Sequence, residues 1–122
     1  MRPGARPVKR STRVGELLRQ ILASILLERV ADPRLQELTI TEVEMSPDLK
    51  QARVYYLARQ GTDLEELVIA LDKAMGFIKQ EVAREHILRT MPELHFLPDD
   101  TLDKAERLER LLQAARKGPD EE

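Results

Sequence analysis

The sequence contains no cysteine and no tryptophan among its 122 residues, and aromatic residues make up only 3% of it. Without cysteine, disulfides, thiol nucleophiles and zinc–thiolate sites are excluded. With so few aromatic side chains, the core has to be built from leucine, isoleucine and valine. The length suits one domain, and a hydrophobic fraction of 42% indicates a folded rather than a disordered chain.

Long apolar runs are also missing. The longest, residues 21–27, is far shorter than the roughly 20 residues of a membrane-spanning helix. The basic N-terminal stretch lacks the apolar segment of a secretory signal, so we expect a cytoplasmic protein.

Acidic residues are absent from the first thirteen positions, although the net charge of the chain is −2. That net charge argues against a general nucleic-acid binder. The basic residues in this stretch are Arg2, Arg6, Lys9, Arg10 and Arg13. A basic arm on an acidic body either binds polyanions locally or forms a solvated tail.

The first half of the chain predicts a helix followed by a β-hairpin. Apolar residues at helical spacing begin after Ser11 or Thr12, either of which can cap the helix, and the helix should end before Pro33. Two stretches rich in β-branched and aromatic residues follow, residues 38–45 and 51–59, with a turn between them. The apolar alternation of the first stretch is imperfect, which predicts a β-bulge or a change of burial along the strand.

The stretch over residues 64–89 has apolar residues on one helical face, and Gly76 lies in its middle. Glycine destabilises a helix interior by roughly 1 kcal/mol relative to alanine. We interpret Ala74, Met75 and Gly76 as a kink, or as a tight joint between two helices. At such a joint, exposed N–H groups of the second helix would attract phosphate. The alternative is that Gly76 only lets another element pack closely.

Further signals set the boundaries in the second half. Thr62 and Glu65 have the spacing of a capping box at the start of the long helical stretch. Residues 93–98 alternate as a short third strand. Asp100 or Thr101 then caps a last helix with a leucine-rich face.

The predicted organisation is a basic flexible arm at residues 1–10, an α+β domain at 11–98, a C-terminal helix at 99–117 and an acidic tail at 118–122. Each helix has one apolar face, so the helices should cover one face of a three-stranded sheet.

No pattern indicates catalysis. His86 and His95 lie on different predicted elements without a metal-ligand pattern, and we interpret both as surface or hydrogen-bonded histidines. Asp99 and Asp100 could be paired carboxylates for acid–base chemistry, but adjacent acids before a helix are more typical of a turn and a cap. We therefore expect no enzyme, no metal and no cofactor. An RNA-processing nuclease using Asp99 or Asp100 is the enzymatic alternative.

Binding fits the charge pattern better. Basic side chains gather around the kink and along the helix after it, at Lys73, Lys79, Arg84 and Arg89. Acidic residues between them partly cancel their charge, and surface ion pairs of little energetic value would explain most of them. A different alternative is a protein-binding adaptor that docks a partner on the leucine face of the last helix.

Several stretches resemble the bacterial ribosome-binding factor A family. They are DPRL at residues 32–35, VEMSPDL at 43–49, ARVY at 52–55, AMGFI at 74–78 and PELHF at 92–96. Together with the Asp-rich turn before the last helix they span residues 8–112 in the order of the family. The resemblance implies a KH-like RNA-binding domain of the bacterial (type II) topology, in which an Ala-x-Gly kink, here Ala74, Met75 and Gly76, replaces the GxxG loop.

The resemblance also implies a function. The resemblance is to a family of monomeric assembly factors that bind 16S rRNA in the 30S subunit, near the neck. It implies that this chain assists maturation of the 5′ end of that RNA and that it is associated with cold adaptation. Assembly GTPases and ribosomal proteins are further implied partners, and no cofactor is needed. We expect contacts to RNA phosphates from Arg10, Arg13, Lys73, Lys79, Arg84 and Arg89. Gln80, Glu81 and Ile87 make this surface less basic than the family suggests.

Overall fold

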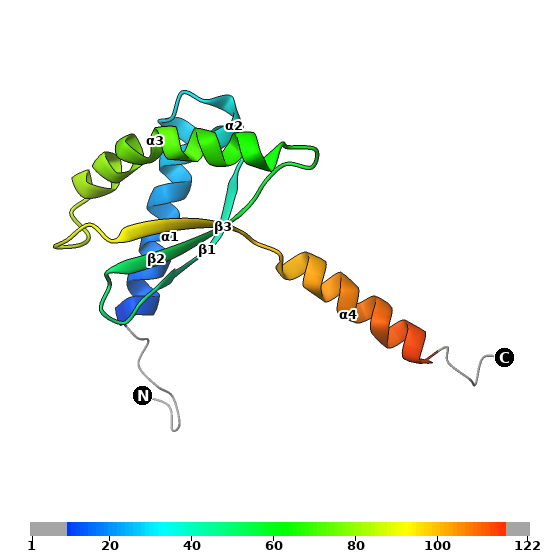
Figure 1. Ribbon diagram of the computed structural model, residues 1–122. Helices are drawn as coiled ribbons and strands as arrows, with labels where there is room; N and C mark the ends of the chain where they lie inside the picture. Colours follow the sequence, from blue (N-terminus) through cyan, green and yellow to red (C-terminus); the bar gives the residue numbers. More distant parts are fainter. Residues whose placement is uncertain (1–9, 117–122) are drawn as a thin grey trace, which may run out of the picture.

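The computed structural model describes residues 10–116, apart from the side chains at 102, 103 and 116. The predicted acidic tail lies outside these residues, and so does the predicted arm apart from Arg10. Figure 1 shows the elements along the chain. They are α1 (Arg10–Glu28), α2 (Pro33–Gln36), β1 (Thr39–Met45), β2 (Gln51–Leu57), α3 (Leu64–Arg84), β3 (Glu93–Pro98) and α4 (Thr101–Arg116). The predicted α+β class is confirmed.

The three strands form one mixed sheet in the order β1-β2-β3. β1 and β2 pair antiparallel, which confirms the predicted hairpin. β3 pairs parallel with β2, with Leu94 opposite Ala52. A parallel neighbour requires a crossover connection, and α3 provides it.

The predicted bulge lies between Ile40 and Glu42, where the register of β1 against β2 shifts. The extra residue, Thr41, explains the imperfect alternation of the sequence. Because side chains alternate along a strand, one inserted residue brings Ile40, Val43 and Met45 to the same face. All three are buried.

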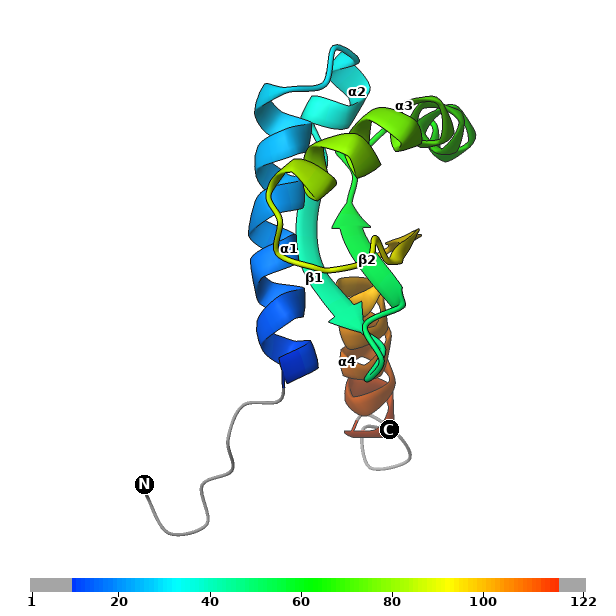
Figure 2. The same ribbon diagram turned by 90° about the vertical axis from the view of Figure 1, so that its left-hand side faces the viewer.

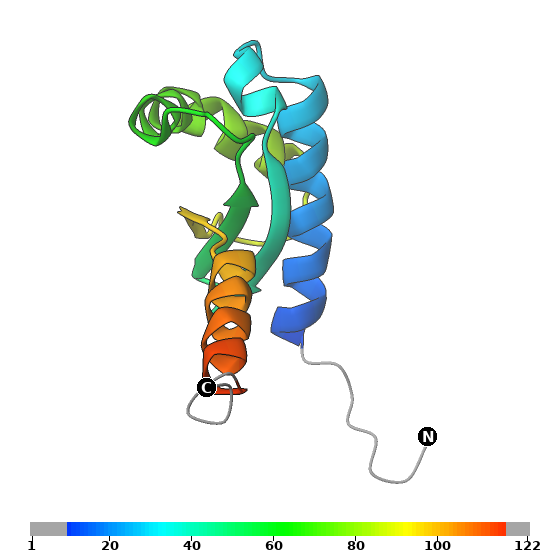
Figure 3. The same cartoon turned by 90° about the vertical axis from the view of Figure 1, so that its right-hand side faces the viewer.

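One face of the sheet carries the core. In β2 the buried residues Ala52, Val54 and Tyr56 alternate with Arg53, which is exposed, and Tyr55, which is half-buried. Figures 2 and 3 show α1 alongside the strands and α3 crossing above them. Helices α1 and α3 therefore cover a single face of the sheet, as predicted.

Helix α1 lies very close to β1 at one glycine. A Cβ atom built on Gly15 would lie 2.5 Å from the carbonyl oxygen of Val43, so only glycine fits at this position. The buried face of α1 beyond this point includes Leu18, Leu22 and Ile25, which are fully buried. The contact at Gly15 thus sets how closely the first helix packs on the sheet.

Two predicted helix starts are wrong. Arg10 is already helical, so Ser11 and Thr12 lie inside α1 and neither is its cap. At α3 the cap is Asp63, whose carboxylate accepts hydrogen bonds from the backbone N–H groups of residues 65 and 66, and no capping box with Thr62 forms. Before α4, Asp100 directly precedes the first helical residue, as predicted, and its carbonyl accepts a bond from the N–H of residue 104, at 2.9 Å. The Asp99 carboxylate adds a bond from the N–H of residue 101, also at 2.9 Å.

The short helix α2 was not predicted. Asp32 caps it and Pro33 occupies its first turn. Proline suits this position because the N–H group that it lacks would have no partner inside the helix. α1 does end before Pro33, as predicted, but the same residue also starts the next helical turn.

Helix α3 passes through Ala74, Met75 and Gly76 without a break. The predicted joint between two helices is therefore wrong, and no second N-terminus with exposed N–H groups exists there. No atom lies within 4 Å of a Cβ built on Gly76, so the close-packing alternative is wrong as well. The helix axis does change direction: the first half is seen nearly end-on in Figure 2, whereas the second half runs across the view. α3 ends at Arg84, so Arg89 lies in the loop before β3 rather than on the predicted longer helix.

Helix α4 points away from the rest of the domain (Figure 1) and does not cover the sheet. Its leucine face is open to solvent, with Leu108, Leu111 and Leu112 exposed by 58%, 68% and 47%. None of the helices in residues 10–116 has the length and apolar character needed to cross a membrane.

The carboxylate of Asp99 links β1 to the start of α4 through hydrogen bonds, and its charge should make the stability of the protein depend on pH. The Thr101 and Thr41 hydrogen bonds stabilise its charged form and hold the pKa of the carboxyl below its ordinary value of 3.8. A lowered folded-state pKa adds stability that is present above the unfolded value and is lost as pH falls through the folded one. We expect Asp99→Asn to lower the melting temperature at pH 7, and the difference from the unmodified protein to shrink below about pH 4.

Thermal unfolding at pH 3 and pH 7 tests this expectation. Asp100→Asn is the control, because among the described residues the Asp100 carboxylate forms a single, exposed ion pair, with Lys104 at 3.4 Å. An equal loss of melting temperature by Asp99→Asn at both pH values would show that the charge of Asp99 does not matter.

Candidate nucleic-acid interface

Three basic residues from distant parts of the chain line one hollow of about 470 Å³. Arg10 starts α1, Lys50 lies in the loop between β1 and β2, and Arg89 lies in the loop between α3 and β3. We call these three residues the basic end. Apolar side chains, Leu49 and Met91 among them, complete the hollow.

Local hydrogen bonds hold Lys50 in place. The Asp48 carboxylate accepts bonds from the backbone N–H of Lys50 at 3.0 Å and from the hydroxyl of Ser46 at 2.7 Å. These bonds lower the pKa of Asp48. The carbonyl of Lys50 accepts a bond from the N–H of Glu93 at 2.9 Å, which joins this loop to the start of β3. The parallel pairing of β2 and β3 thus brings the loops with Lys50 and Arg89 together.

The charges of the basic end are available for a ligand. Within residues 10–116, none of Arg10, Lys50 and Arg89 forms an ion pair, although Asp48 and Glu93 also line the hollow. Arg13 is exposed three residues after Arg10, on the same side of α1. Phosphate groups are ligands that such cations bind.

Arg84 is tied to a carboxylate instead. Glu81 is buried, with 7% of its surface exposed, and accepts bonds from Arg84 and from Arg29 at 3.1 Å each. Arg29 also lies 3.6 Å from Glu85. The sequence predicted pairing of charges along this helix, and the ion pair of Glu81 with Arg84 is one such pair. It did not predict that Arg29, just after α1, would also pair with Glu81.

The predicted cations on α3 do not share one surface. At about 100° per residue, Lys73 and Arg84 fall on one flank of the helix and Lys79 falls roughly 120° away from them. The structure therefore brings Arg10 and Arg89 together and places Arg13 beside Arg10. Lys73, Lys79 and Arg84 do not line the hollow of the basic end. Lys50 was missed, and its signal is that it is a basic residue directly after the turn at residues 46–49.

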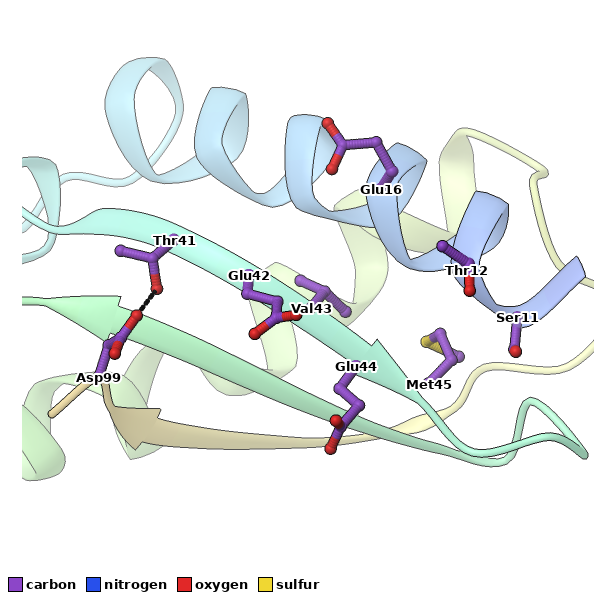
Figure 4. A pocket seen from close by; sticks show the side chains of 9 residues that line it. All are labelled: Ser11, Thr12, Glu16, Thr41, Glu42, Val43, Glu44, Met45 and Asp99. Carbon is purple, nitrogen blue, oxygen red and sulfur yellow. Dashed lines mark hydrogen bonds between the residues drawn. The ribbon is translucent and has the colours of Figure 1, made fainter. Parts of the chain in front are cut away.

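A contrasting acidic hollow of about 490 Å³ lies between α1 and β1. Figure 4 shows Glu16, Glu42, Glu44 and Asp99 around it, with Thr41 bonded to Asp99 at one end. No basic side chain lines it among the described residues. Because like charges repel, this hollow disfavours polyanions, whereas the charge of the basic end favours them.

A mixed three-stranded sheet with helices α1 and α3 on one face defines a small α+β domain of the KH-like class. The sequence contains no GxxG. The chain belongs to the ribosome-binding factor A family, whose model, described as "Ribosome-binding factor A", matches residues 10–112. The resemblance noted in the sequence is thereby confirmed.

The relatives agree with this assignment. Ribosome-binding factor A of Methylobacillus flagellatus is 44% identical over 107 residues, which are 87% of this chain and 84% of the relative. The crystal structure of ribosome-binding factor A from Thermus thermophilus matches with a TM-score of 0.64 and 31% identity, over 72% of this chain and 94% of that one. A homology model of the Thermus thermophilus factor, fitted into a cryo-EM map of a 30S–RbfA complex, matches with a TM-score of 0.58 and 32% identity, over 70% of this chain and 90% of that one.

Proposed function

We propose that the protein is a non-catalytic ribosome biogenesis factor that binds the 30S subunit through 16S rRNA in the cytoplasm. On this proposal it acts as a monomer without a cofactor and assists late maturation of the subunit, including processing of the 5′ end of 16S rRNA. Assembly GTPases and ribosomal proteins are its proposed further partners. Family membership and the relative fitted into a 30S complex support the proposal.

The observation that carries the proposal is the convergence of Arg10, Lys50 and Arg89 on one hollow. Cations that contact phosphates fix the position of a protein on RNA without reading its sequence. RNA shape then supplies specificity. The acidic remainder of the surface limits adhesion to unrelated RNA.

Co-sedimentation with purified 30S subunits over a salt series tests the basic end. We expect the double variant Arg10→Glu with Arg89→Glu to bind at least tenfold more weakly at low salt. Its log–log dependence on salt should also be shallower by about one to two units, because each lost phosphate contact removes roughly 0.7–0.9 of the slope. Steady binding with an unchanged slope would refute the basic end as the RNA site.

The matched control is Arg59→Glu with Arg107→Glu, which changes the net charge equally on exposed residues of the loop after β2 and of α4. It should bind with nearly the affinity and the salt slope of the unmodified protein. Equal weakening of both double variants would indicate a general charge effect instead of a site.

The second candidate function is a protein-binding adaptor, which the exposed leucines of α4 favour. Deleting residues 101–122 separates the two. Loss of 30S association on this deletion, with the Arg10 and Arg89 variant still bound, would support the adaptor.

A further inference from the structure

A second hollow, of about 340 Å³, lies between the end of α1, α2 and the middle of α3. Its floor is apolar and includes Val30, Leu35 and Ala70, and Arg29 and Lys73 also line it. The 19 residues of α1 span about 28 Å, so this hollow lies at the opposite end of that helix from Arg10.

Phe77 lines this hollow and is the aromatic residue that the fold leaves exposed. Of the other aromatic residues, Tyr56 is 2% exposed, and Tyr55 and Phe96 are half-buried, whereas Phe77 is 40% exposed. A ring that is half open beside an apolar floor is a surface on which a nucleobase can stack, and such stacking tolerates any base.

The charges around the ring suit a nucleotide, because the one carboxylate that lines the hollow among the described residues, Asp32, is paired with Arg34 at 2.8 Å. Lys73 forms no ion pair within the described chain, and its charge helps to lower the pKa of Asp32, an effect caused mainly by hydrogen bonds from Arg34. Arg29 is held by Glu81, at 3.1 Å. At Gly76, next to Phe77, an added Cβ atom would have no other atom within 4 Å, so the helix surface is bare beside the ring.

We propose that this hollow binds one unstacked base of single-stranded RNA, with the base on the ring of Phe77 and an adjoining phosphate at Lys73. The proposal rests on the proposed function, and it adds a contact made by stacking to the phosphate contacts of the basic end. The charge of Lys73 favours a nucleotide over an apolar side chain of a partner protein as the occupant, because an apolar side chain has no negative group for Lys73 to bind.

Affinity for 30S subunits at several salt concentrations tests the proposal with three variants. Phe77→Leu removes the ring but keeps an apolar side chain, and we expect about tenfold weaker binding with an unchanged salt slope. Phe77→Tyr keeps a ring and should bind as the unmodified protein does. Lys73→Gln should weaken binding and lower the slope by roughly one unit.

Phe77 is partly exposed, so all three variants should keep the melting temperature of the unmodified protein, which is measured alongside. If the unmodified protein does not bind 30S subunits, the proposed function fails, and this inference fails with it. If it binds and Phe77→Leu binds equally well, only the inference is overturned.

Photo-cross-linking separates RNA from protein as the occupant. Subunits whose 16S rRNA contains 4-thiouridine are irradiated with the bound protein, and the protein is digested with trypsin. Cleavage after Lys73 and Lys79 yields the peptide of residues 74–79, which contains Phe77. A nucleotide attached to this peptide is expected. A cross-link to RNA only in peptides of the basic end, or to a ribosomal protein at residues 74–79, would overturn the proposal.

Discussion

Replacing Gly15 with alanine should destabilise the protein by about 1–3 kcal/mol, the usual cost of overpacking a well-packed site. The added Cβ would lie 2.5 Å from the carbonyl oxygen of Val43 and 3.5 Å from Cγ of Met45. The first neighbour is backbone inside a strand, so it cannot swing aside as a side chain would. Helix α1 would have to move away from the sheet, which loosens the buried contacts of Leu18 and Leu22.

Urea unfolding of Gly15→Ala and Gly76→Ala side by side measures this effect. Both changes remove a glycine from a helix interior, which alone favours the folded state by up to about 1 kcal/mol. A Cβ at Gly76 meets no atom within 4 Å, so Gly76→Ala should show only that gain. If Gly15→Ala proved as stable as Gly76→Ala, α1 could not lie so close to β1 in solution.

The sequence predicts the strands well because alternation is a local signal. The bounds of β3, Glu93–Pro98, agree with the prediction. The bulge was visible because Ile40 and Val43 are separated by an odd number of positions although both are apolar. A strand that buries one face leaves such a mismatch in its sequence.

The first residues of the helices were predicted less well than the strands, because several neighbouring residues can cap the start of a helix. Thr62 and Asp63 are adjacent and both are good caps, so the choice depends on the path of the incoming chain. The hydroxyl of Thr62 instead donates a bond to the carbonyl of Arg59, at 2.6 Å. At residues 32–33, the Asp-Pro pair suits a helix start as well as a helix stop.

The candidate site could be predicted only in part because it depends on tertiary pairing. Arg10 was predicted as part of the basic arm and Arg89 as part of the helix after the kink, and nothing local shows that Lys50 joins them. The bond between Glu93 and Lys50 and the parallel register of β2 and β3 make that neighbourhood. These are long-range features, so spacing along the chain does not reveal them.

The role of Glu81 also depends on long-range contacts that spacing along the chain does not reveal. Glu81→Gln should lower the free energy of unfolding by about 1–3 kcal/mol, the contribution of hydrogen bonds to a charged group. The side chain is buried and bonds Arg29 of the loop after α1 and Arg84 of α3. Removing its charge leaves two guanidinium groups near each other without the carboxylate between them.

Glu85→Gln is the control, because Glu85 is exposed and lies 3.6 Å from the same Arg29. Exposed ion pairs contribute about 0–1 kcal/mol, so this change should have little effect on urea unfolding. A double-mutant cycle of Glu81→Gln with Arg29→Gln then isolates the pair. A coupling near zero would mean that Glu81 stabilises the protein through its bond with Arg84 or through its packing, and not through Arg29. A coupling of about 1 kcal/mol or more would show that the ion pair between Glu81 and Arg29 joins the end of α1 to α3.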